Sequence, residues 1–95
     1  MAAYVIAQVT VTDPVRYEEY RQLVPATIEQ YGGRFIARGG AVEILEGNWE
    51  PGRLVIIEFP TAGQARAWWS SPEYAEARAI RQATSDGTLL ILEGV

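Results

Sequence analysis

The chain has 95 residues and a formal net charge of −4, and this length predicts one domain over residues 1–95. It contains neither cysteine nor histidine, which excludes disulfides, thiol nucleophiles, the usual zinc sites and imidazole catalysis. Its basic residues are scattered and it has no long apolar run, so we expect neither a nucleic-acid partner nor a membrane span. Nothing marks a metal site, a cofactor site or a signal peptide, so we expect a cytoplasmic protein without metal or cofactor.

The first third of the chain predicts a strand followed by a helix. Side chains alternate strictly over residues 3–12, which is the period of a strand. Asp13 and Pro14 then supply a helix cap and a first helical residue, Pro25 is a point where the helix can kink, and Gly32-Gly33 ends it. The apolar stripe of this helix consists of Tyr17, Tyr20, Val24, Ile28 and Tyr31.

The middle of the chain predicts two strands joined by a hairpin loop. The second strand begins at Arg34, bulges at Gly39-Gly40 and resumes over residues 41–46. Residues 47–52 are rich in turn formers and read as the hairpin connection. The third strand covers residues 53–59.

The last third predicts a broken helix and a fourth strand. A capping box over residues 61–64 starts the helix, Ser71-Pro72 restarts it, and it continues to about Ala83. A turn over residues 85–87 leads to a strand over residues 88–93. The order β-α-β-β-α-β predicts an α+β, ferredoxin-like fold in which an antiparallel sheet carries both helices on one face.

The other face of this sheet is too apolar to face water. Four of its seven predicted members are large aliphatic residues, whereas an open face would be mostly polar. A second copy of the sheet would cover it, so we expect a homodimer with the sheets packed face to face, a dimeric α+β barrel. The seven residues are Ile6, Gln8, Ile36, Arg38, Leu54, Ile56 and Glu58.

A set of motifs along nearly the whole chain resembles a bacterial family, the domain of unknown function thirteen-thirty. The motifs are Gly32-Gly33-Arg34, Arg38-Gly39-Gly40, Glu46-Gly47, Trp49, Pro51, Arg53, Glu58-Phe59-Pro60, Trp68, Ser71-Pro72-Glu73-Tyr74 and Arg78. The family is similar to the dimeric α+β barrel superfamily, which includes cofactor-independent monooxygenases and muconolactone isomerases as well as binding and regulatory domains. The resemblance implies the fold and the dimer. Because enzymes of that superfamily often rely on a histidine, it implies no reaction for this chain.

Glu58 is the first candidate site residue, because a carboxylate ends an aliphatic strand and is costly to bury there unless it is paired. It is either a general base with a pKa raised by burial or the structural partner of an arginine such as Arg38. We expect Arg38 on the same face as Glu58, where it either holds a substrate carboxylate or pairs with Glu58.

Six further residues are candidates near a pocket or an interface. Trp49, in the hairpin loop, is either a lid or an anchor in a partner subunit, and Glu46 and Arg53 flank that loop and could pair across it. Trp68, Tyr74 and Arg78 lie on the second helical region; they either line a pocket or serve the core and the surface. Tyr17 and Tyr20 are interpreted as core residues.

Three functions remain open. The first is a small-molecule binding domain, with the ligand between sheet and helices or in the dimer interface. The second is a cofactor-independent enzyme acting on a small aromatic or carboxylated compound, with Glu58 as base and Arg38 holding the anion. The third is an interaction module without a ligand.

Overall fold

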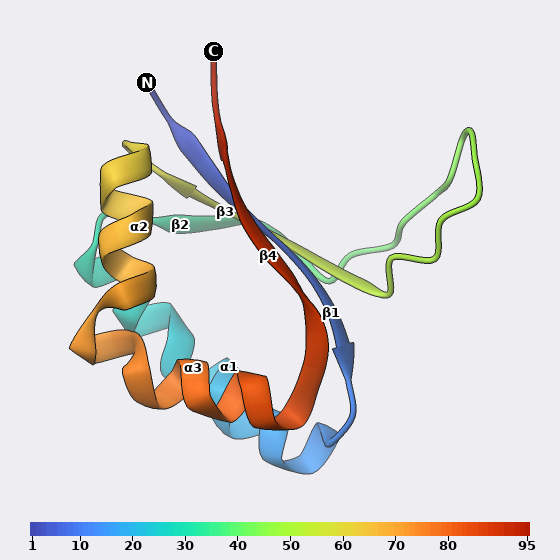
Figure 1. Ribbon diagram of the computed structural model, residues 1–95, viewed down its shortest axis with the longest axis horizontal. Helices are drawn as coiled ribbons and strands as arrows, with labels where there is room; N and C mark the ends of the chain where they lie inside the picture. The colour runs from blue at the N-terminus through green and yellow to red at the C-terminus, as the bar shows by residue number, and fades with distance from the viewer.

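The chain folds into four strands and three helices, and the computed structural model describes all residues from Met1 to Val95 (Figure 1). The predicted alternation of strands and helices is confirmed, with the second helical region divided in two. The elements are β1 (Ala3–Val11), α1 (Pro14–Gln30), β2 (Arg34–Arg38), β3 (Arg53–Phe59), α2 (Ala62–Ser70), α3 (Pro72–Thr84) and β4 (Ser85–Glu93).

The strands form one antiparallel sheet in the order β2-β3-β1-β4. The three helices lie on one face of it (Figure 1). This is the ferredoxin-like α+β arrangement predicted from the order of elements. None of the helices combines the length and the hydropathy that crossing a bilayer requires.

Helix α1 begins and ends as its sequence predicts. The side chain of Asp13 accepts a hydrogen bond from the backbone N–H of Arg16 at 3.2 Å, and Pro14 occupies the first turn. At the other end Gly32, with φ of 79°, takes the left-handed conformation that closes a helix. The helix runs without a break through Pro25.

The core lies between the helices and the face of the sheet that alternation assigned to it. Val5, Val9, Val55, Ile57 and Phe59 are all buried there. At its centre lies the fully buried indole of Trp68, whose ring centroid is 5.5 Å from that of Phe59 and 4.1 Å from that of Tyr74. Aromatic rings at such distances add attraction beyond the area that they bury.

The connection between β2 and β3 differs from the prediction. Strand β2 ends at Arg38 and does not resume over residues 41–46; residues 39–52, here called the arm, contain no strand or helix. The arm extends away from the sheet and the helices (Figure 1). It exposes apolar side chains, among them Leu45 at 88% and Trp49 at 56%.

Strand β4 also differs from the prediction, because it starts at Ser85 directly after α3 without the expected turn. Gly87 makes this possible. A Cβ atom on Gly87 would overlap the backbone carbonyl of Gln8 and lie 3.0 Å from Cα of Val9. The missing side chain lets β4 pair with β1 along its whole length.

Candidate ligand-binding site

A bulge in β2 decides which residues face the helices. Phe35 pairs with Ile57 of β3, but Ala37 pairs with Ile56 and Arg38 with Val55, so Ile36 is an extra residue in β2. Because side chains alternate between faces along a strand, one inserted residue moves everything after it to the opposite face. The prediction that Arg38 shares a face with Glu58 is therefore wrong: Arg38 lies on the helix side with Val55.

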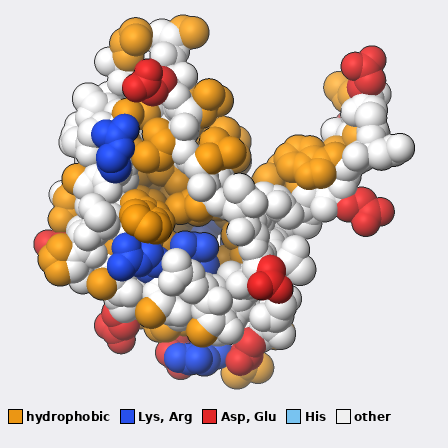
Figure 2. Space-filling view, in the orientation of Figure 1, with side chains coloured by type: hydrophobic (Ala, Val, Ile, Leu, Met, Phe, Trp, Pro, Cys, Tyr) orange, Lys and Arg blue, Asp and Glu red, His pale blue; other side chains and the backbone are white.

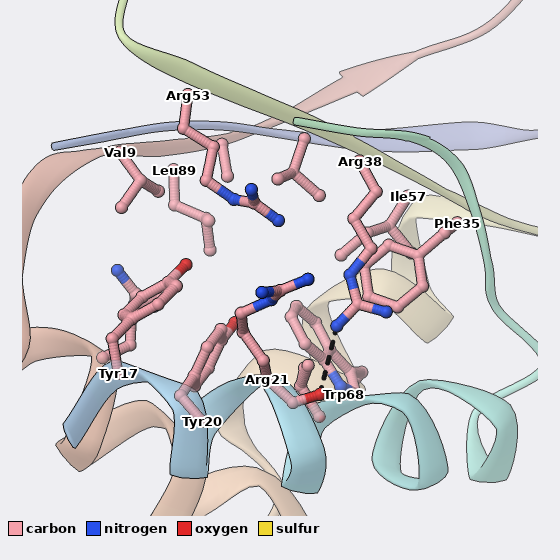
Figure 3. A pocket seen from close by; sticks show the side chains of 14 residues that line it. Val9, Tyr17, Tyr20, Arg21, Phe35, Arg38, Arg53, Ile57, Trp68 and Leu89 are labelled. Atoms are coloured by element: carbon pink, nitrogen blue, oxygen red, sulfur yellow. Dashed lines mark hydrogen bonds between the residues drawn. The ribbon is translucent and has the colours of Figure 1, made fainter. Parts of the chain in front are cut away.

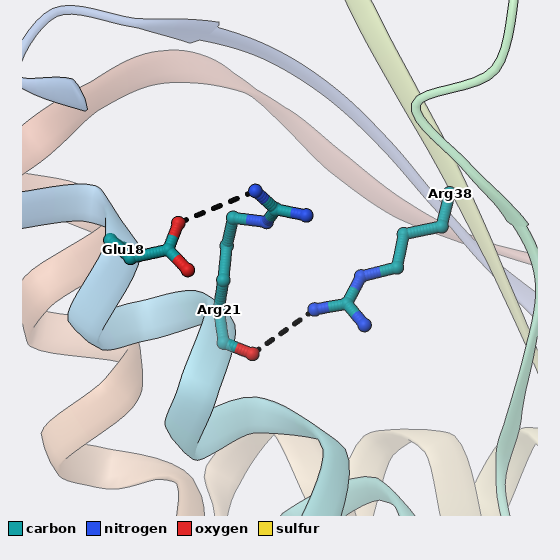
Figure 4. Close-up of polar contacts among 3 residues, drawn as sticks. All are labelled: Glu18, Arg21 and Arg38. Atoms are coloured by element: carbon teal, nitrogen blue, oxygen red, sulfur yellow. Dashed lines mark hydrogen bonds and ion pairs between the residues drawn. The ribbon is translucent and has the colours of Figure 1, made fainter.

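Arg38 is held in place by α1 and by its own strand. Its Nη2 donates a hydrogen bond to the backbone carbonyl of Arg21 at 3.1 Å (Figure 4), and its guanidinium lies 4.2 Å from the ring centroid of Phe35. The carbonyl of Arg21 is the one that Pro25, lacking an N–H, leaves free within the helix. Burial lowers the pKa of Arg38, and the positive charges of Arg21 and Arg53 lower it further.

Arg53 reaches into the same space from the start of β3 (Figure 3). Its Nε is buried and has no hydrogen-bond partner. Its guanidinium packs on the backbone of Gly39, where a Cβ atom would overlap Nη1 and lie 2.7 Å from Cζ. Arg53 thus forms no ion pair with Glu46, which lies in the exposed arm, and the predicted cross-hairpin pair is wrong.

Two tyrosines of α1 form the floor of this space. Burial raises the pKa of Tyr17, although the neighbouring Arg53 guanidinium opposes the shift. The hydroxyl of Tyr20 lies 3.1 Å from that of Tyr74, which accepts a hydrogen bond from Nε of Arg81 at 3.2 Å. Burial, followed by the negative charge that Tyr74 would carry, raises the pKa of Tyr20 well above its ordinary value.

These side chains surround a cavity between the sheet and the helices. The enclosed volume is about 20 Å³, enough for at least one water molecule. In the space-filling view a hollow lined with hydrophobic side chains opens to solvent, and basic side chains border it (Figure 2). The lining residues are Ala7, Val9, Tyr17, Tyr20, Arg21, Val24, Phe35, Arg38, Arg53, Val55, Ile57, Trp68, Arg81 and Leu89.

The charged residues that line the cavity are all basic. Four of the eight basic residues of the chain line it, and none of the twelve acidic residues does. Among the four cavity arginines only Arg21 has a carboxylate partner, Glu18 at 3.3 Å, and that pair is exposed (Figure 4). Arg38, Arg53 and Arg81 have no ion-pair partner, so the cavity holds unneutralised positive charge.

Glu58 lies outside this cavity. Its carboxylate accepts a hydrogen bond from Nε of Arg34 at 2.9 Å, and Arg34 pairs with it directly across β2 and β3. Its neighbour on β1 is Tyr4, so it faces away from the helices. Glu58 and Arg38 thus lie on opposite faces of the sheet, and the role of Glu58 as a base stays a prediction.

The other predicted site residues divide between the cavity and the surface. Trp68 lines the cavity and donates from its indole N–H to the hydroxyl of Thr27 at 3.1 Å. Tyr74 lies behind the cavity in the core. Arg78 lies over the ring of Trp69 and donates to its backbone carbonyl at 2.8 Å, outside the cavity. Trp49 is on the exposed arm.

Sequence reasoning missed Arg53 and Arg81 as members of the site and assigned Tyr17 and Tyr20 to the core alone. Both tyrosines are indeed buried, and they also line the cavity. Two signals were present in the sequence. A proline inside α1 leaves a carbonyl free, and a glycine after Arg38 makes room for a large side chain.

The sequence matches the profile of a bacterial family described as a domain of unknown function (DUF1330) over residues 2–95. The chain belongs to this family. The resemblance that its motifs indicated is therefore confirmed over nearly the whole length. No curated protein matches the sequence.

Solved structures show how widely the fold of this family member is shared. A protein of unknown function from Rhodopseudomonas palustris is similar with a TM-score of 0.80 at 20% identity, covering 99% of this chain and 82% of the other. A dimeric ferredoxin-like protein of unknown function from Jannaschia has a TM-score of 0.73 at 14% identity, covering 99% and 100%. A cofactor-independent oxygenase from Streptomyces nogalater has 0.68 at 14%, covering 99% and 93%.

Proposed function

We propose that the protein is a homodimer that binds a small molecule in the cavity between the sheet and α1. One observation carries the proposal: a partly open, aromatic-lined cavity bordered by three arginines, Arg38, Arg53 and Arg81, that have no acidic partner. Ligand sites are mostly apolar concave spaces with a few polar groups that converge on them. Of the predicted site residues, Arg38 and Trp68 belong to this site. The cytoplasmic location expected from the sequence is part of the same proposal.

Two apolar surfaces support the dimer. Strand β4 exposes Leu90 at 46% and Leu92 at 54% on the face away from the helices, and the arm exposes Leu45 and Trp49. Residues 39–50 of the arm are all exposed, so most of the arm gains little from contacts with its own chain. A second copy would cover both surfaces, and the related structure from Jannaschia is described as dimeric.

The dimer is tested by light scattering during size-exclusion chromatography. We expect the mass of two chains of 10.5 kDa each over a range of concentrations. A mass of one chain at micromolar concentration would refute the homodimer and leave the cavity untouched.

The ligand site is tested by titrating ¹⁵N-labelled protein with benzyl alcohol and with benzoate, two compact probes. We expect backbone amide shifts at residues around the cavity, and we expect Leu89→Trp, which fills the cavity, to abolish them. Val15→Trp is the matched control, because Val15 is 85% exposed on α1. Shifts confined to the arm or the outer sheet face, or no shifts with either probe, would overturn the proposed site.

A further inference from the structure

We infer that the ligand of this cavity is a compact organic acid whose carboxylate is held by the guanidinium groups of Arg38 and Arg53. The inference rests on the proposed function, because it names the chemical class of the molecule bound at that site. It goes beyond that function in requiring a negative charge on the ligand and in assigning the residues that recognise it.

The first argument is the electrostatic cost of the empty cavity. Arg38 and Arg53 reach toward α1 from neighbouring strands and point into one space (Figure 3). Their charges repel each other, which is why Arg53 contributes to the lowered pKa of Arg38. A structural role would place a carboxylate between them, as Glu58 is placed beside Arg34 on the outer face. Here no carboxylate of the chain is so placed, and an anion from outside the chain neutralises the two guanidinium groups instead.

The second argument is the unused hydrogen-bonding capacity. A guanidinium carries five N–H donors, and Arg38 spends one of them on the carbonyl of Arg21. Arg53 has a buried Nε without an acceptor, and buried donors are almost always paired. The phenol of Tyr17 lies beside Arg53 and offers a further donor. Planar guanidinium groups match the two oxygens of a carboxylate.

The third argument is the apolar remainder of the lining, which predicts that the ligand is apolar apart from its carboxylate. Ten of the fourteen lining residues are hydrophobic, among them Phe35, Trp68 and Leu89. A fully hydrated inorganic anion would not use these surfaces, whereas an organic acid places its apolar body on them. The enclosed volume of about 20 Å³ is small, so the acid must be compact, with its apolar body on these surfaces and its carboxylate toward the basic side chains that border the hollow (Figure 2).

A separate feature of the backbone positions each of the two guanidinium groups. Pro25 exposes the carbonyl that fixes Arg38. Gly39, with φ of 68°, leaves the space that the guanidinium of Arg53 occupies. Two independent backbone features thus direct two like charges into one cavity, against their mutual repulsion.

The test compares four probes on the intact protein by NMR titration: benzoate, benzyl alcohol, benzylammonium and inorganic phosphate. We expect benzoate to bind at least about tenfold more tightly than benzyl alcohol, and benzylammonium not to bind. Arg53→Met should weaken benzoate binding about ten- to hundredfold, the loss of one charge-assisted interaction, and leave benzyl alcohol unchanged. Arg16→Met, which removes an exposed arginine of α1, should change neither.

The outcomes distinguish a failure of the ligand site itself from a failure of the assigned carboxylate. Equal binding of benzoate and benzyl alcohol would overturn the carboxylate and keep the site, whereas no cavity shifts with any probe would overturn the site itself. Phosphate binding as tight as benzoate would overturn the organic acid. Arg53→Lys provides a second variant in case Arg53→Met fails to fold. Lysine keeps the positive charge but lacks the paired N–H donors of a guanidinium, so benzoate affinity equal to wild type would overturn the assigned contact with both carboxylate oxygens.

Discussion

The guanidinium of Arg38 donates to the backbone carbonyl of Arg21, 3.1 Å away on α1 (Figure 4). Within a regular helix this carbonyl would accept the N–H of the residue four positions later, which here is Pro25. The helix therefore presents a hydrogen-bond acceptor to the side chain of Arg38 at one point along its length. Pro25, which the sequence marked as a possible kink, thus frees the carbonyl to which a cavity side chain is attached.

Pro25→Ala should stabilise the helix and impair the site. The new N–H competes for the carbonyl of Arg21, so we expect the free energy of unfolding to rise by up to about 3 kcal/mol while benzoate binding weakens. Chemical denaturation and NMR titration measure the two effects. Pro14→Ala is the control, because the first helical turn has no such bond to recover. Benzoate affinity that stays at the wild-type value would show that Arg38 does not depend on this contact.

Gly39→Ala should impair the ligand site by displacing the guanidinium of Arg53. The added methyl group overlaps the guanidinium of Arg53 and the residue has φ of 68°, so we expect benzoate affinity to fall about as far as in Arg53→Met. Gly40→Ala meets nothing within 4 Å and should leave affinity unchanged. Titration of both variants gives the comparison, and equal affinities would contradict the packing of Arg53 on Gly39.

Arg53→Met should make the ligand-free protein more stable. The substitution removes a positive charge that repels Arg38 and a buried Nε without a partner, and an unsatisfied buried donor costs about 1–3 kcal/mol. We expect an increase in the free energy of unfolding in urea of about that size, and a smaller increase in concentrated salt, which screens the repulsion. A destabilised variant would mean that Arg53 is a structural residue.

Tyr20 makes stability depend on pH in the alkaline range. Burial raises its pKa in the folded protein above the ordinary value of 10.0, so its contribution to stability is complete below about pH 10 and is lost as the pH rises above that value. In Tyr20→Phe we expect lower stability at pH 8, because a hydrogen bond to Tyr74 is lost. We also expect a shallower decline between pH 9 and 11. Parallel pH profiles of denaturation would contradict the assignment.

Trp49→Ala should weaken the dimer and spare the protomer. The indole is 56% exposed on the arm, so its removal costs the isolated chain little, whereas an aromatic anchor in an interface is worth about 2 kcal/mol or more. Sedimentation equilibrium measures the dissociation constant, with Trp69→Ala on α2 as the control. A constant that does not change would place Trp49 outside the interface.

The sequence predicted the fold because its signals are local. Alternation over β1 and β3 assigned Val5 and Ile57 correctly to the core face, and the glycine and proline residues marked most element ends. The caps at Asp13 and Ser71 are formed by neighbouring residues alone. Where an element end depended on a distant contact, as at Ser85, the prediction failed, because the close approach of Gly87 to β1 leaves no local trace.

The site was predicted only in part for the same reason. The face of Arg38 depends on the bulge at Ile36, a residue type that carries no bulge signal, and the expected bulge at Gly39-Gly40 was three residues too late. Arg53 was interpreted as a possible ion-pair partner of Glu46 across the hairpin loop. Its direction is set by Gly39, which is close to it only after β2 and β3 pair.

The extra residue in β2 has a consequence for comparing this chain with others of its family. If Ile36 paired with Ile56 in an unbroken ladder, Arg38 would oppose Leu54 and its guanidinium would point to the outer face, where Glu58 lies. Two homologues with the same arginine could therefore differ in whether their cavity is charged. The presence of the bulge between Phe35 and Ala37, more than that of the arginine, separates relatives that share this ligand class from those that do not.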